Sequence, residues 1–404
     1  MTGITTGPVG AVEAADAARK APLDVKGQTA ILFTAFEPSG DAHAAPVIAE
    51  LLRKVPSLKI YAWGGPEMEA AGASIVERTA TDGAMGLSSI SRGWAVHREI
   101  RRIKRWSARF RVLAHVPVDS PAANFPICRY MRTRGARIIH LVAPQLWAWG
   151  RWRLGKLRRN TDLVLCLLPF EEPWFGDRNV PARFIGHPAI NRSLDADTLR
   201  TSAFGLPQGT PRLAIFPGSR AQEVRMNMPL MAKVYHELQG RHSGICGLIV
   251  AANDACAKII RRKIKVFPTG LSMVHGQRDE VIHWADVSLA VSGTITMHIA
   301  RQRKAMVGIY KTDVLSWLLG KVLLRSRHVL LPNIIADREI VPEFAPYIGG
   351  PGPLVREISR LLSDSKNVAN QSEELQRVCY RFANKRPAEE AANLIIKVIK
   401  AGKA

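Results

Sequence analysis

Short apolar segments alternate with helix-like segments through most of this 404-residue chain, and this alternation limits its possible folds more than any other feature. One series begins with the apolar segment at residues 29–36, and a second begins at residues 212–216. A continuous apolar run of this length is typical of a strand buried on both faces, as in a parallel sheet. Strand–helix–strand units in two series therefore predict an α/β protein with two parallel-sheet domains.

The two series meet near residues 191–211, where we expect the domain boundary. We expect a first domain over residues 27–195, a second over residues 205–345, and further helices over residues 346–404. Residues 1–26 contain no apolar core like that of a signal peptide, and we expect a flexible tail. The chain has no run of about 20 uninterrupted apolar residues, so no transmembrane helix is expected.

The formal charge of the chain is +23, and the basic excess lies outside its first 26 residues. Such an excess indicates an anionic partner, which could be a lipid surface, a nucleic acid or a phosphorylated substrate. The chain carries no recognised nucleic-acid motif, and its aromatic residues do not interleave with its basic ones as in a stacking platform. These observations argue against nucleic acid.

Polar residues gather in four loops that each follow an expected strand. Parallel sheets bind ligands at the carboxyl ends of their strands. Glycine lets the backbone approach a ligand, and arginine beside a helix start suits phosphate. Each loop alone could be a turn with a helix cap. Together they predict one domain that activates an acceptor with carboxylates and one that holds a phosphorylated donor. The candidate residues are Glu37, Ser39, Gly40 and Asp41; Asp119; Gly218, Ser219 and Arg220; and Ser292, Gly293 and Thr294.

The motifs EPSGDAHA, AMGLSSI, VDSPAANF, FIGHP, FPGSRAQEV, SGT and LPNIIADREIVPE occur in this order, with a WAW-to-LPFE segment before FIGHP. In this the chain resembles the bacterial lipid-A-disaccharide synthases over about residues 29–345. The resemblance implies a GT-B fold, in which two Rossmann-like domains face an inter-domain cleft. It also implies an inverting glycosyltransferase that needs no metal or cofactor. Its reaction joins UDP-2,3-diacylglucosamine to 2,3-diacylglucosamine 1-phosphate, releasing UDP and a β-1,6-linked disaccharide.

The resemblance also assigns roles to individual positions. Asp119 is implied to be the general base that takes the proton of the acceptor 6-hydroxyl as that oxygen attacks the anomeric carbon. Arg220 is implied to face the donor diphosphate. The other positions that correspond to the family's site are implied to bind substrate: Glu37, Ser39, Gly40, Asp41, Gly218, Ser219, Ser292, Gly293, Thr294, His298, Asn333, Arg338 and Glu339.

Two positions depart from the family pattern. Ala122 stands where the family usually has a carboxylate shortly after the catalytic aspartate, and His298 stands where it usually has a glutamate. We expect His298 to meet the ribose of the nucleotide, with a pH dependence near pH 6–7 because histidine titrates there.

Members of the family work in the cytoplasm, peripherally at the inner face of the cytoplasmic membrane, and some pair as homodimers that exchange carboxy-terminal helices. The positive charge agrees with an anionic membrane surface as partner, and we expect apolar side chains near Trp94 and in residues 314–324 to insert shallowly. Two other functions stay open. One is a GT-B transferase or epimerase that acts on a different, soluble nucleotide sugar. The other is a catalytically weakened relative that only binds lipid or nucleotide.

Overall fold

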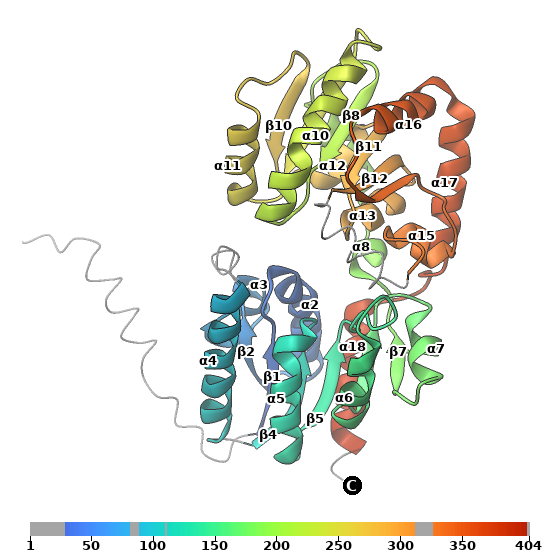
Figure 1. The fold of residues 1–404 in the computed structure, drawn as a ribbon. Helices are drawn as coiled ribbons and strands as arrows, with labels where there is room; N and C mark the ends of the chain where they lie inside the picture. The colour runs from blue at the N-terminus through green and yellow to red at the C-terminus, as the bar shows by residue number, and fades with distance from the viewer. Residues whose placement is uncertain (1–28, 81–88, 110, 312–325, 402–404) are drawn as a thin grey trace, which may run out of the picture.

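The computed structural model describes residues 29–80, 89–109, 111–311 and 326–401, which form two α/β domains, one above the other in Figure 1. Within these ranges, no helix combines the length and the apolar character needed to span a bilayer. The side chain of Trp94 and residues 314–324, which the sequence suggested as membrane contacts, lie outside what the structure describes.

The first domain is built on a seven-stranded parallel sheet in the order β3-β2-β1-β4-β5-β6-β7. Ile31, Leu32 and Phe33 of β1 are all fully buried, because helices cover both faces of the sheet. The strands are β1 (Thr29–Thr34), β2 (Lys59–Gly64), β3 (Ser74–Arg78), β4 (Arg111–Pro117), β5 (Arg137–Leu141), β6 (Leu163–Cys166) and β7 (Ala182–Phe184). The helices are α2 (Pro38–Lys54), α3 (Pro66–Ala70), α4 (Ser89–Ser107), α5 (Pro121–Thr133), the 3-10 turn η2 (Arg151–Arg153), α6 (Leu154–Arg159), α7 (Glu171–Gly176) and α8 (Pro188–Asn191).

The second domain is built on a six-stranded parallel sheet in the order β10-β9-β8-β11-β12-β13. Its strands are β8 (Arg212–Phe216), β9 (Cys246–Ala251), β10 (Leu271–His275), β11 (Val287–Val291), β12 (Ala305–Lys311) and β13 (Glu343–Tyr347). The helices that follow α8 are α9 (Ala196–Phe204), α10 (Ala221–Gln239), α11 (Asp254–Lys263), α12 (Arg278–Trp284), α13 (Ile295–Arg301), α15 (Leu331–Ala336), α16 (Gly352–Ser363), α17 (Ser365–Tyr380) and α18 (Pro387–Ala401).

The strand order of each sheet reverses once, and the reversals place the four polar loops. β1 lies between β2 and β4, and β8 lies between β9 and β11. At such a switch point the loops after the two adjacent strands lead to opposite faces of the sheet and leave a crevice between them. The four loops singled out in the sequence follow β1, β4, β8 and β11. They are therefore the loops of the two switch points.

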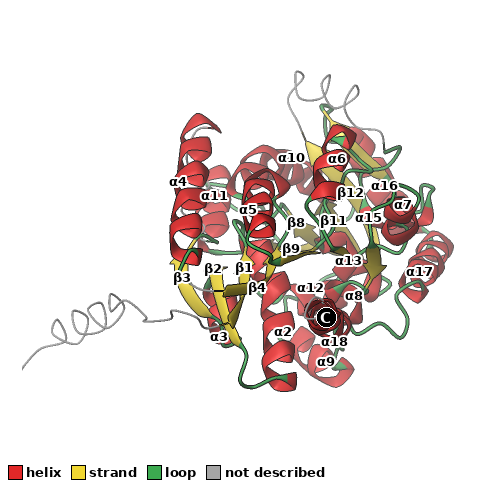
Figure 2. Cartoon of the chain, turned by 90° about the horizontal axis from the view of Figure 1, so that it is seen from below, coloured by secondary structure: helices red, strands yellow, loops and turns green. Residues whose placement is uncertain are grey.

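The carboxy-terminal helices are divided between the domains. Leu354 of α16 lies in the apolar core of the second sheet, whereas Ala391 and Ile395 of α18 lie in the core of the first domain together with Leu51 of α2. In Figure 1 the red chain leaves the upper domain after α17 and enters the lower domain as α18. Figure 2 looks along α18, which lies beside α2 and α8. The chain therefore crosses between the domains twice.

Candidate active site

The first loop places a carboxylate at the boundary between the domains. Glu37 is the residue before α2, and Pro38 occupies the first helical position, where a missing N–H costs nothing. Glu37 Oε2 accepts a hydrogen bond from Arg220 Nη2 at 2.8 Å, and the two side chains are about half exposed. Two predicted site residues, one from each domain, are thus paired across the two switch points.

The third loop forms a tight anion-binding turn, but a carboxylate of the same chain fills it. Gly218 has a φ of +115°, and a Cβ there would lie 2.7 Å from the Cβ of Glu223. Glu223 Oε2 accepts the backbone N–H groups of Ser219 at 3.2 Å and Arg220 at 3.3 Å, and its Oε1 accepts Arg220 Nη1 at 3.2 Å. Glu223 thus caps the start of α10 in the way that the glutamate of a capping box does, while the Arg220 side chain can only donate. The donors predicted to hold phosphate therefore bind Glu223.

Asp119 ends the second loop in an unusual backbone conformation. Its φ is +47° and that of Ser120 is +41°, a region that residues with a Cβ rarely occupy. The Asp119 N–H donates to the carbonyl of Leu141 at 3.1 Å. Burial raises the pKa of Asp119, the Ser120 N–H lowers it, Glu37 raises it and Arg220 lowers it. Asp119 is thus within electrostatic reach of the pair that joins the domains.

Asp41, in contrast, is engaged by the fold itself. Its carboxylate is buried and accepts the backbone N–H groups of Gly65 at 2.9 Å, Glu67 at 2.9 Å and Met68 at 3.0 Å. These are the free donors at the start of α3, so Asp41 caps that helix. Of its neighbours, Gly40 is buried and Ser39 is exposed.

The fourth loop lies beside the third because β11 is the neighbour of β8. The Ser292 hydroxyl donates to the carbonyl of Val329 at 3.1 Å, so it ties the loop to the segment before α15. Gly293 has a φ of +155°, and Thr294 is exposed at the start of α13. Ser292 and Gly293 are half-buried.

His298, on α13, belongs to a charged cluster that the sequence did not reveal. Its Nδ1 lies 3.8 Å from Asp279 Oδ1, and Asp279 forms ion pairs with Arg301 at 2.9 Å and Arg278 at 3.1 Å. Burial and the charge of Arg278 lower the pKa of His298 to about 3, although Asp279 opposes the shift. The titration expected near pH 6–7 is therefore wrong for this residue, which stays neutral there. In the sequence, Asp279 stood out only as the middle residue of the charged segment Arg278-Asp279-Glu280.

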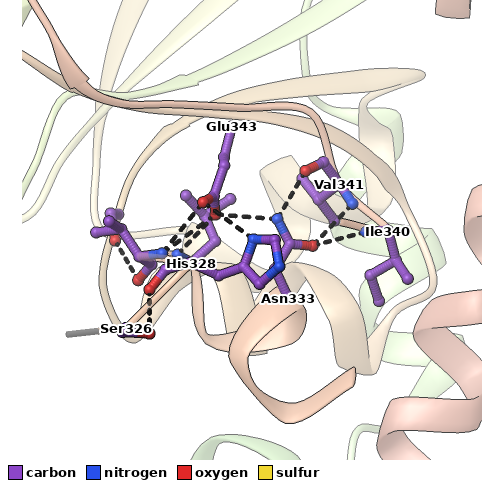
Figure 3. A network of polar contacts seen from close by, with 9 residues as sticks. Ser326, His328, Asn333, Ile340, Val341 and Glu343 are labelled. Atoms are coloured by element: carbon purple, nitrogen blue, oxygen red, sulfur yellow. Dashed lines mark hydrogen bonds and ion pairs between the residues drawn. The ribbon is translucent and has the colours of Figure 1, made fainter. Parts of the chain in front are cut away.

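The LPN-to-RE segment is held together by a buried network (Figure 3). Asn333 is fully buried, and its Oδ1 accepts the N–H groups of Ile340 and Val341, both at 2.9 Å. Its Nδ2 donates to the carbonyl of Val341 at 2.8 Å and to Glu343 Oε2 at 3.0 Å. Glu343 also accepts the N–H of Val329, whose carbonyl holds Ser292. The network thus supports the fourth loop from behind.

The other two residues of that motif lie on the surface. Arg338 pairs with Glu374 of α17, and Glu339 is exposed. No hydrogen bond or ion pair joins Glu339 to another of the described residues. Within the same described ranges, no group of three or more His, Cys, Asp or Glu side chains could hold a metal ion.

The WAW-to-LPFE segment surrounds a buried carboxylate. Glu171 accepts the Trp147 Nε1–H at 3.0 Å and the Leu168 N–H at 3.0 Å. Burial raises the pKa of Glu171 to about 7. Trp147 lies in one apolar cluster with Phe216 and Phe382, so this segment also contributes to the contact between the domains.

Comparison with known proteins identifies close similarity over most of the chain. A family model described as lipid-A-disaccharide synthetase matches residues 31–398. The lipid-A-disaccharide synthase of Anaeromyxobacter dehalogenans strain 2CP-1 is 32% identical over 338 residues, which cover 83% of this chain and 88% of that protein. The lipid-A-disaccharide synthase of Pseudomonas paraeruginosa strain PA7 is 30% identical over 91% of this chain and 99% of that protein.

Solved structures share the two-domain architecture at low sequence identity. The glycosyltransferase of kitacinnamycin matches with a TM-score of 0.61 and 14% identity over 93% of this chain and 100% of that one. The S. aureus MnaA–UDP structure matches with a TM-score of 0.59 and 9% identity over 92% and 96%. These likenesses confirm the predicted GT-B fold.

Proposed function

This chain belongs to the lipid-A-disaccharide synthase family, and we propose that it transfers 2,3-diacylglucosamine from UDP to 2,3-diacylglucosamine 1-phosphate. The products are the β-1,6-linked disaccharide and UDP. One observation carries the assignment of the site. The Glu37–Arg220 ion pair brings the switch points of the two domains together beside Asp119.

In the proposed reaction Asp119 is the general base. The 6-hydroxyl oxygen of the acceptor attacks the anomeric carbon, and its proton passes to the Asp119 carboxylate. The bond from the anomeric carbon to the UDP oxygen breaks, and UDP leaves with the electron pair. Burial and Glu37 raise the pKa of Asp119, which makes it a better proton acceptor than an exposed aspartate.

Arg220 stabilises the departing diphosphate in this proposal. A guanidinium offers a forked donor for phosphate oxygens, and the turn at Gly218 exposes two backbone N–H groups beside it. Because Glu223 now holds these donors, the diphosphate has to displace its carboxylate. Ser292, Gly293 and Thr294 would face the same nucleotide from the neighbouring loop. Asp41 and Asn333 then support the site rather than touch substrate.

A direct assay tests the function. The purified protein is given UDP-diacylglucosamine and diacylglucosamine 1-phosphate, and UDP and disaccharide are both measured. Asp119→Asn should lower the rate by about 10²–10⁴-fold with the fold intact. Asp197→Asn, which neutralises a carboxylate that is 90% exposed on α9, is the matched control. Turnover of a different nucleotide sugar, or UDP binding without turnover, would favour one of the other GT-B functions.

We further propose that the chain meets an anionic membrane through a surface on η2 and α6, here termed the tryptophan–arginine surface. Trp152 is 69% exposed and Trp149 is 44% exposed. The Arg153 guanidinium lies over the Trp149 ring at 4.9 Å. Tryptophan and arginine together suit a bilayer interface, where apolar rings and anionic headgroups meet. The surface comprises Trp149, Arg151, Trp152, Arg153, Lys156, Arg158 and Arg159.

The charges of this surface are free to bind an anionic partner. Among the described residues, none of its five cations forms an ion pair with a carboxylate, although ion pairs are frequent elsewhere on the protein. Each basic residue near an anionic membrane contributes about 1 kcal/mol. The surface therefore supports a peripheral location at a leaflet rich in anionic lipid.

Vesicle sedimentation tests this contact. The protein should bind vesicles of phosphatidylglycerol and phosphatidylethanolamine at low salt, and high salt should release it. Replacing both Trp149 and Trp152 with Ser should weaken binding, whereas Phe204→Ser, at a 78% exposed aromatic on α9, should not. Equal binding by the double variant would refute the proposed surface, and preferential binding to DNA over vesicles would refute the proposed partner.

A further inference from the structure

The backbone that carries Asp119 needs support from outside the turn. Asp119 and Ser120 both have positive φ, and neither is a glycine. Two consecutive residues in this region are unfavourable, because the Cβ of each crowds the following carbonyl. The conformation persists only where neighbouring groups hold it, so the contacts of the turn show what fixes the Asp119 side chain in place.

A buried amide supplies that support. Asn124 Nδ2 donates to the carbonyl of Asp119 at 2.8 Å and to the carbonyl of Val118 at 3.3 Å. Asn124 lies on α5 and is fully buried. An asparagine at the N-cap position accepts the free N–H groups of its own helix, but the N-cap of α5 is Ser120 and Asn124 is the fourth residue of the helix. This one instead binds two carbonyls at the end of β4, so it holds the strand end rather than the helix.

Two further buried side chains set the direction of this amide. The Thr34 hydroxyl is 2.6 Å from Asn124 Oδ1 and 2.8 Å from His115 Nε2. An amide oxygen can only accept, so the hydroxyl donates to Asn124 and must accept from His115. Burial lowers the pKa of His115 to about 3, so the ring is neutral and carries its single proton on Nε2. These hydrogen bonds, from His115 to Thr34 and from Thr34 to Asn124, orient the amide so that its N–H groups face the carbonyl of Asp119.

We propose that Asn124 is a positioning residue for Asp119, and that Thr34 and His115 fix the orientation of its amide. This inference rests on the proposed role of Asp119 as the general base. The amide clasp, meaning the Asn124 side chain with its contacts to Val118 and Asp119, holds the Asp119 peptide between the Leu141 carbonyl on one side and α5 on the other. The carboxylate is thereby kept in the field of Glu37 and Arg220, where it meets the acceptor.

Kinetics of three variants test the catalytic part of the proposal. Asn124→Ala removes the clasp, and Thr34→Val removes the hydroxyl that orients it. Both should lower kcat by roughly 10²-fold, since a displacement of about 1 Å costs that much, while KM for both substrates changes little. Thr34→Ser keeps the hydroxyl and should retain most of the activity. Gln371→Ala is the control, because Gln371 is also a buried amide that clasps a strand, β12, far from Asp119 in the sequence.

The pH profile separates positioning from a general loss of stability. Glu37 raises and Arg220 lowers the pKa of Asp119, and burial raises it most. If the clasp is lost and Asp119 turns toward solvent, its pKa falls, so the acidic limb of kcat should move to lower pH in Asn124→Ala. A variant that is merely less stable loses activity without this shift.

Hydrogen exchange tests the clasp without using activity. Residues 117–124 include the Asp119 N–H, which donates to Leu141. Exchange in this segment should accelerate in Asn124→Ala and Thr34→Val, but not in Gln371→Ala. Unchanged exchange there, or a normal kcat in Asn124→Ala, would overturn the proposal. An inactive wild-type protein would overturn the proposed function instead, and the exchange data would still decide the clasp.

Discussion

Removing the Glu223 carboxylate should make the protein bind UDP more tightly. Glu223 occupies the two backbone donors and the guanidinium that we assign to the diphosphate. In Glu223→Gln the side chain keeps its length but loses its charge. The amide side chain of Glu223→Gln therefore competes less strongly than the carboxylate with an incoming phosphate for the same hydrogen-bond donors.

The size of the effect follows from the contacts that hold the carboxylate. A carboxylate at a helix N-terminus gains about 0.3–1 kcal/mol from the helix dipole. Its ion pair with Arg220, a side chain that is 52% exposed, adds roughly 0.2–1 kcal/mol after solvent screening. The diphosphate has to replace a total of about 0.5–2 kcal/mol, which corresponds to roughly 2- to 30-fold in UDP affinity.

Titration calorimetry with UDP, compared with thermal unfolding, measures this balance. Glu223→Gln should lose some stability, because the hydrogen bonds from Glu223 to the N–H groups at the start of α10 are weakened, and at the same time gain affinity for UDP. The gain should shrink as salt is raised. Glu237→Gln removes an exposed carboxylate from the far end of the same helix and is the matched control. Equal or weaker UDP binding by Glu223→Gln would show that its carboxylate does not occupy the phosphate site.

Three further predictions concern other groups of the site. Arg220→Ala should weaken UDP binding by about 10- to 150-fold, because it removes one charge-assisted hydrogen bond of about 1.5–3 kcal/mol. Arg225→Ala, at an exposed arginine on the same helix, should leave UDP binding unchanged. If calorimetry finds the two variants alike, Arg220 does not belong to the donor site. Because the pKa of His298 is lowered to about 3, its titration should add no inflection to the pH profile of UDP affinity between pH 6 and 8. The wild type and His298→Gln should therefore show profiles of the same shape, and an inflection that disappears in His298→Gln would contradict this. Burial raises the pKa of Glu171 in the folded protein to about 7, above its value of about 4.3 in the unfolded chain. The free energy of unfolding of the wild type, relative to that of Glu171→Gln, should therefore fall as the pH rises from about 4.3 to about 7. The fall should be at most about 3–4 kcal/mol. Urea unfolding at pH 5 and pH 7.5 measures that change, and a difference independent of pH would refute it.

The sequence predicted the loops that form the candidate site better than it predicted what the side chains of these loops contact. Apolar runs predicted the strands, and the ends of these strands drew attention to Glu37, Asp119 and Arg220. They did not predict the distances between these three side chains. The direction of a side chain depends on contacts from distant segments. Asp41 lies in the first turn of α2, four residues after Glu37, yet it caps a helix that begins 25 residues later, at Pro66.

Other features were visible in the sequence but had no meaning without the fold. Glu223 is part of the FPGSRAQE segment at capping-box spacing from Arg220, but only the structure shows that its carboxylate takes the donors expected for phosphate. Asn124 stands in VDSPAANF, and its contacts with Thr34 and Asp119 depend on the pairing of β1 with β4. The family match placed Asn333 in the motif, whereas its burial assigns it to the framework.

The double crossing of the chain between the domains restricts how the two domains can move relative to one another. The first crossing follows α8 and the second precedes α18, and the Asn191 side chain donates to the carbonyl of Phe382 at 2.7 Å, which ties the two crossings together. Sliding of one domain along the other would strain both connections. Moving the domains apart would also break the Glu37–Arg220 ion pair, which links the two domains as well.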